Sequence, residues 1–225
     1  MQQTFRAEAI VLRRTNYGEA DRILSVLTPD RGKLSAIAKG VRKPKSKLAG
    51  GLELLAVCDI TLAQGKGSMH LVTSARLNQF YGDILHEYER MELACVCIKQ
   101  IGKTAEMVGE PEFYYLLRDS LMYLNTKHID WRITELWFRL RMQTLLGHGI
   151  NLATDREGEK LAADAVYHYD FAENALFKDG RGRFNAEHIK LLRLAAVKTP
   201  AILRQVSGLD AVLDDCLWLL RTVEQ

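Results

Sequence analysis

The hydrophobic positions of the first 80 residues recur mainly with a period of two, the spacing of side chains on one face of a β-strand. Five segments have this character, separated by glycine, proline or aspartate residues: 5–14, 22–28, 32–39, 52–63 and 68–77. In the last two segments, we expect these side chains to face a core: Leu52, Leu54, Ala56, Cys58, Ile60, Leu62, Met69, Leu71 and Ala75. Five short strands predict a small closed barrel, and an OB-fold is the leading form of that size.

From Phe80 onward the hydrophobic period lengthens to that of an α-helix. One long helix is predicted over residues 84–108, with an apolar face of Ile84, Tyr88, Met91, Cys95, Ile98, Ile101, Ala105 and Val108. Further helices are predicted to begin near Pro111, to cover residues 133–144, to follow Asn185 as N-cap, and to begin near Leu209.

The helical pattern breaks down over about residues 148–185, where residues 166–171 and 175–179 are expected to pair as a hairpin. We therefore predict a multidomain α+β protein. Residues 1–80 form a five-stranded OB-fold barrel, and residues 81–225 form an all-α helical domain with a short inserted hairpin region.

Composition is typical of a globular chain with a real core, since hydrophobic residues make up 48% and charged residues 26%. No secretory signal and no apolar run of membrane-spanning length is evident, so we expect a cytoplasmic protein without a membrane partner. The four cysteines lack the paired spacing of a zinc site and suit a reducing compartment.

Charge is distributed unevenly along the chain. Residues 1–80 hold 13 Lys/Arg and 6 Asp/Glu, whereas residues 81–225 hold 18 Lys/Arg and 22 Asp/Glu. Five of the positive charges fall within residues 39–47, which contain no carboxylate. This polarity indicates that the first half binds a polyanion, although a solvated loop is the ordinary explanation of an isolated basic run.

Strand positions add to the basic run and favour nucleic acid as the polyanion. Arg13, Arg14 and Arg22 come from strands that a small barrel would bring close to it. The predicted DNA contacts are Arg13, Arg14, Lys33, Lys39, Arg42, Lys43, Lys45 and Lys47. Because the barrel half has few aromatic residues for base stacking, binding is expected to run through phosphates and to accept single and double strands.

No enzyme motif is present. The sequence has no phosphate-binding loop of the G-x-x-x-x-G-K-[ST] type, no G-x-S-x-G and no H-E-x-x-H, and its six histidines are scattered singly. We therefore expect a protein without catalytic, cofactor-binding or metal-binding residues.

Several motifs together resemble the N-terminal barrel of the RecO family of bacterial recombination mediators. These motifs occur in the family's order and spacing: Tyr17-Gly18-Glu19, Thr28-Pro29-Asp30-Arg31-Gly32, Ala38-Lys39-Gly40-Val41-Arg42 and Ser46-Lys47-Leu48. The sequence LLGHGINL at residues 145–152 also resembles the family's L-G-x-G-x-x-L. The similarity is strong to about residue 65 and looser beyond it.

The resemblance implies a non-enzymatic protein of the RecFOR pathway of DNA repair and recombination. Family members bind single- and double-stranded DNA and anneal complementary strands. With RecR, they displace single-strand-binding protein so that RecA loads. Many members also carry a four-cysteine zinc knuckle after the L-G-x-G segment, but residues 148–207 here contain no cysteine, so we expect no zinc.

Two other functions fit the residues. One is an RNA-binding OB-fold protein, which comparison of DNA and RNA affinities would identify. The other is an adaptor whose helical domain binds protein while the basic run only aids solubility. In that case, nucleic-acid affinity would not depend on the charges of residues 39–47.

Overall fold

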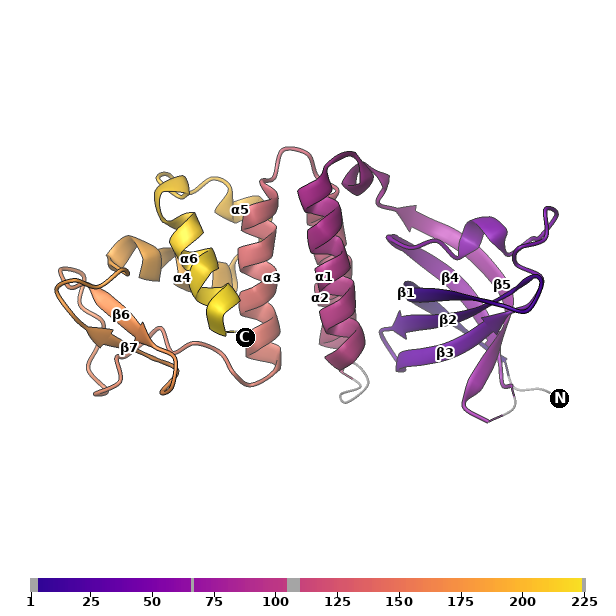
Figure 1. The fold of residues 1–225 in the computed structure, drawn as a ribbon, viewed down its shortest axis with the longest axis horizontal. Coiled ribbons are helices and arrows are strands. Elements are labelled where there is room, and N and C mark those ends of the chain that lie inside the picture. Colours follow the sequence, from indigo (N-terminus) through magenta and orange to yellow (C-terminus); the bar gives the residue numbers. More distant parts are fainter. Residues whose placement is uncertain (1–3, 66, 105–109, 224–225) are drawn as a thin grey trace. The chain divides into compact units, whose positions relative to one another are not determined.

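The computed structural model describes residues 4–65, 67–104 and 110–223. The chain divides into two compact units, Met1–Asn125 and Thr126–Gln225. The first unit contains a barrel and two helices, and the second contains the remaining helices and a hairpin (Figure 1). Within the described ranges, no helix is both long enough and apolar enough to cross a bilayer.

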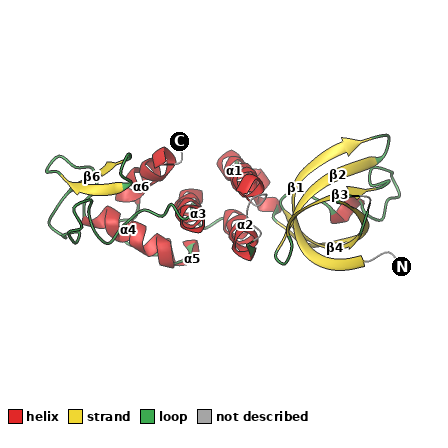
Figure 2. Cartoon of the chain, turned by 90° about the horizontal axis from the view of Figure 1, so that it is seen from below, coloured by secondary structure: helices red, strands yellow, loops and turns green. Residues whose placement is uncertain are grey.

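Five strands form the barrel: β1 (Thr4–Tyr17), β2 (Asp21–Thr28), β3 (Gly32–Ala38), β4 (Ala56–Ala63) and β5 (Met69–Phe80). The strands close in the order β1-β2-β3-β5-β4, with β4 returning to β1. Figure 2 shows these strands curving into the barrel. Only the β3–β5 pair is parallel. This arrangement is that of an OB-fold, and the predicted fold class is confirmed.

β-Bulges decide which side chains fill the barrel. Val72 of β5 pairs with Leu62, but Ser74 pairs with Thr61, so Thr73 is an extra residue in the ladder. An extra residue resets the in-and-out alternation. Val72 is therefore buried, whereas Met69 and Leu71 are only partly buried, which corrects our assignment of those two residues to the core face.

Two helices complete the first unit after a short 3-10 helix, η2 (Gly82–His86): α1 (Tyr88–Thr104) and α2 (Pro111–Leu124). The predicted apolar face of α1 is largely wrong. Tyr88 is 73% exposed and Met91 45%, whereas the buried residues are Arg90, Leu93, Ala94, Cys97 and Ile101. Glu87 is extended and breaks the helical register after η2, so Ile84 does not share a face with α1. Ala105 and Val108 lie outside the described residues.

A partly buried hydrogen bond attaches α2 to the barrel. The hydroxyl of Tyr114, which is fully buried, donates to Oε1 of Glu8 on β1 at 2.6 Å. Burial and this hydrogen bond raise the pKa of Tyr114, so the phenol stays protonated as the donor.

The barrel itself ends at Phe80, and the first unit continues to Asn125. The predicted division into domains 1–80 and 81–225 stays a prediction.

The second unit consists of α3 (Trp131–Leu145), α4 (Ala186–Val197), α5 (Pro200–Leu203), α6 (Asp210–Val223) and a hairpin of β6 (Tyr167–Asp170) and β7 (Ala175–Lys178). Asn185 caps α4 by accepting from the backbone N–H of Glu187 at 3.0 Å, as predicted. The hairpin lies where the sequence indicates it.

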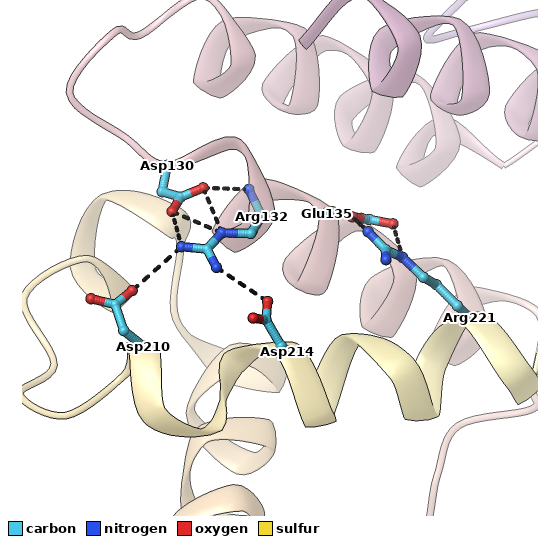
Figure 3. Close-up of polar contacts among 6 residues, drawn as sticks. All are labelled: Asp130, Arg132, Glu135, Asp210, Asp214 and Arg221. Carbon is cyan, nitrogen blue, oxygen red and sulfur yellow. Dashed lines mark hydrogen bonds and ion pairs between the residues drawn. The ribbon is translucent and has the colours of Figure 1, made fainter. Parts of the chain in front are cut away.

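Ion pairs join α3 to α6 in this unit (Figure 3). Arg132 contacts Asp130, Asp210 and Asp214. Glu135 is buried and accepts from Nε of Arg221 at 2.8 Å and from Nε of Arg139 at 2.8 Å. Burial alone would raise the pKa of Glu135, but the hydrogen bonds and charges of the two arginines outweigh it and hold this pKa below its ordinary value.

Candidate nucleic-acid interface

Residues 39–51 form a chain of turns attached to one end of the barrel. Gly40, at φ 63°, leads the chain out of β3, and its N–H donates to Oδ1 of Asp21 at 2.7 Å. A side chain at Gly40 would be strained in this left-handed conformation. The N–H of Arg42 donates to the carbonyl oxygen of Ala20 at 2.9 Å. The segment is therefore tied to the turn between β1 and β2.

Two apolar side chains anchor the segment to the core. Val41 is 3% exposed and belongs to the buried barrel cluster, and Leu48 packs against the same cluster. Between them, the N–H of Lys43 donates to the carbonyl of Gly40 and that of Ser46 to the carbonyl of Lys43. The backbone is thus held by successive turns.

The cations of this segment project into solvent. All five are exposed: Lys39, Arg42, Lys43, Lys45 and Lys47. In the part of the chain that the structure describes, none of them forms an ion pair with a carboxylate, although a guanidinium N–H of Arg42 donates to the carbonyl of Gly18 at 3.4 Å. We call these five residues the basic segment. Its uncompensated charge suits a polyanionic ligand.

The other predicted contacts lie elsewhere. Lys33 is the second residue of β3 and Lys39 follows the end of this strand, so at about 3.3 Å per residue they are roughly 20 Å apart. Arg14 pairs with Glu53, with Nη1 2.6 Å from Oε2, so its charge is largely compensated. Arg13 is exposed and makes no ion pair with any described residue.

Arg13 and Lys33 line a groove of about 740 Å³ between the barrel and α1. The ammonium of Lys33 donates to the carbonyl of Gly102 on α1 at 2.8 Å. Lys99 and Lys103, which sequence reasoning missed, line the opposite wall. Their spacing of four residues placed them on one helical face, but only the fold shows that this face points at the barrel.

The comparisons with known proteins concern this same barrel. Residues 1–81 match the family model described as "Recombination protein O N terminal". Residues 1–81 are therefore similar to the N-terminal domain of RecO proteins. The predicted resemblance to the RecO family is confirmed.

Several curated relatives carry the name "DNA repair protein RecO". One from Dehalococcoides mccartyi (strain ATCC BAA-2266 / KCTC 15142 / 195) is 39% identical over 146 residues, covering 64% of this chain and 56% of the relative. One from Heliobacterium modesticaldum is 46% identical over 144 residues, covering 64% and 52%. One from Bifidobacterium longum (strain DJO10A) is 39% identical over 120 residues, covering 52% and 50%. The chain thus spans about half the length of these RecO relatives.

The zinc knuckle of many RecO proteins does not fit the residues of this chain. Residues 148–207 contain no cysteine. Across the described ranges, no three His, Cys, Asp or Glu side chains gather as metal ligands. The carboxylate of Asp155, which is 7% exposed, instead accepts from the backbone N–H groups of Glu157 and Glu159 at 3.1 and 2.9 Å. The N–H of Arg156 donates to the carbonyl of Leu176 on β7, so hydrogen bonds hold this segment against the hairpin.

Proposed function

We propose that this chain is a DNA repair and recombination mediator that binds single- and double-stranded DNA without sequence specificity. The observation that carries the proposal is the basic segment, held on a barrel that matches the RecO N-terminal family model, with its five charges exposed and uncompensated. The names of the RecO relatives support a role in DNA repair.

Contacts with the phosphate backbone of DNA account for the binding of both single and double strands. Lysine and arginine neutralise phosphates and release the counterions condensed on DNA, a contribution that depends on charge and not on base sequence. The turns at residues 40–51 restrain the backbone of the basic segment, so little further ordering of the backbone opposes binding.

Strand annealing follows from the same electrostatics. Two complementary strands repel each other through their phosphates, and a protein that neutralises both lowers that barrier to pairing. The proposed partners are RecR, single-strand-binding protein and, indirectly, RecA. We propose that the protein acts in the cytoplasm by binding DNA and protein partners. In this proposal it breaks or forms no covalent bond and uses no cofactor.

An annealing assay tests the proposal. Two complementary oligonucleotides are used, one labelled with a fluorophore and one with a quencher. They are mixed with and without the protein, and the oligonucleotides are either bare or coated with single-strand-binding protein. We expect faster annealing than in the protein-free reaction, and slower annealing by Arg42, Lys43, Lys45, Lys47→Ala. Annealing no faster than in protein-free buffer would overturn the proposed mediator function.

The same oligonucleotides distinguish the two other functions. Affinity that is clearly higher for matched RNA than for DNA would favour an RNA-binding protein. DNA affinity that the four substitutions leave unchanged would favour an adaptor.

A further inference from the structure

The groove between the barrel and α1 crosses the outer face of three strands. Arg13 on β1 pairs with Ser25 on β2, and Ser25 pairs with Ser35 on β3, so the three residues lie side by side. All three line the groove. In OB-folds, the face formed by the second and third strands binds oligonucleotides. Here α1 adds a second wall to that face.

Positive charge dominates both walls. Arg13 and Lys33 lie on the barrel side, Lys99 and Lys103 lie on the helix side, and no carboxylate is among the lining residues that the structure describes. Lys99 and Lys103 are exposed and make no ion pair with any described residue. Like charges four residues apart on a helix destabilise it slightly, and an anion between the walls would relieve this repulsion.

Apolar side chains also line the groove. Leu12, Ile23 and Leu54 line it from the barrel, and Ile98 lines it from α1. Leu12 lines the groove because it is the extra residue of a bulge between Val11 and Arg13 in the β1–β2 ladder. Aliphatic side chains together with cations on both walls complement a ligand that has apolar faces and a negatively charged backbone.

We propose that this groove holds a short length of single-stranded DNA, with Lys99 and Lys103 of α1 contacting its phosphates. The inference rests on the proposed function and adds a second contact region to the basic segment. The volume of about 740 Å³ is that of a small-ligand site, so a few nucleotides of one strand fit. We expect a duplex, whose major groove alone is about 12 Å wide, to be too bulky for a site of this volume.

A salt titration tests the two lysines. Lys99→Ala with Lys103→Ala removes two phosphate contacts, so the slope of log K against log salt for a single-stranded oligonucleotide should flatten by about 1.4. The slope for a duplex should change by less than half of that value. Arg6→Ala with Arg76→Ala is the charge-matched control, because both arginines are exposed on the barrel and neither lines this groove. The control should leave the slope unchanged.

A thiol footprint locates the DNA independently. Cys95 lines the groove and is exposed, whereas Cys58, Cys97 and Cys216 are buried. Burial raises the pKa of Cys58 to about 11 and that of Cys216 to about 12, which lowers their reactivity further. Alkylation of Cys95 with neutral iodoacetamide should slow about tenfold when oligo-dT is present at ten times its Kd. Peptide mass analysis measures the modification.

The outcomes separate this inference from the proposed function. If the basic-segment substitutions weaken binding but the Lys99/Lys103 slope and the Cys95 rate do not change, the groove is overturned and the mediator function stands. Equal slope changes for single strands and duplexes would overturn single-strand selectivity. If the parent protein binds no DNA, the proposed function itself fails.

Discussion

Removing the carboxylate of Glu135 should destabilise the second unit strongly. This side chain is 4% exposed and accepts charge-assisted hydrogen bonds from Arg139 and Arg221. Losing one partner of a buried ion pair costs about 3–5 kcal/mol. Arg221 is 46% exposed, so solvent screens its share and we take the lower end, about 3 kcal/mol for Glu135→Ala. Glu135→Gln keeps the shape and one acceptor, so it should cost less.

Urea unfolding followed by tryptophan fluorescence measures this change selectively. The chain has three tryptophans, and all of them lie in the second unit: Trp131, Trp137 and Trp218. With an m-value of about 1–2 kcal/mol/M, the transition midpoint of Glu135→Ala should fall by roughly 1.5–3 M. Glu187→Ala is the control, because Glu187 is exposed and its contact with Lys190 spans 3.9 Å. A midpoint for Glu135→Ala within about 0.3 M of the parent would refute this reasoning.

Three further predictions concern pH, the anchoring of the basic segment, and metal. Because Glu135 has a lowered pKa in the folded chain, its stabilising contribution is present above the ordinary carboxylate pKa and is lost as pH falls through the folded value. The stability of Glu135→Gln should therefore fall less steeply on acidification than that of the parent. An identical pH profile of stability for the two proteins would contradict this assignment. Leu48→Ala should loosen the anchor of the basic segment and speed trypsin cleavage after Lys45 and Lys47 severalfold without unfolding the barrel. Unchanged cleavage would show that Leu48 does not restrain this segment. The purified protein should contain no stoichiometric zinc, and chelators should leave its melting temperature unchanged; one zinc per chain would overturn this prediction.

Hydrophobic periodicity predicted the strands and helices well where one face of the element is buried and the other is exposed to solvent. The five strands, the hairpin and the buried face of α6, from Leu209 to Leu220, all follow the sequence pattern. The pattern was misleading where a local irregularity resets the register. Thr73 is such an irregularity in β5, and the extended residue Glu87 before α1 is another.

The basic segment was recognisable because its five charges fall within nine residues of the chain. Its anchoring by Val41 and Leu48 was not, since two apolar residues in a polar run carry no periodic signal. Arg14 was misleading for another reason. Its partner Glu53 is 39 residues away, so only the fold shows that its charge is compensated. Lys99 and Lys103 were missed because they belong to a helix whose orientation the sequence does not specify.

The salt dependence of DNA binding tests the central claim most directly. A fluorescent single-stranded oligonucleotide is titrated across a salt series with the parent and with Arg42, Lys43, Lys45, Lys47→Ala. Five phosphate contacts contribute about 3.5 to the slope of log K against log salt, at roughly 0.7 each. Losing four of them should flatten the slope by roughly 2 to 3 and weaken binding to any sequence.

The matched control removes the same number of charges from exposed positions outside the basic segment and the groove. It carries Arg76, Lys160, Lys178 and Lys198→Ala. The account predicts a flattened slope for the basic-segment variant and a parental slope for the control. Equal slopes for all three proteins would contradict it and leave residues 39–47 as a solvated surface segment.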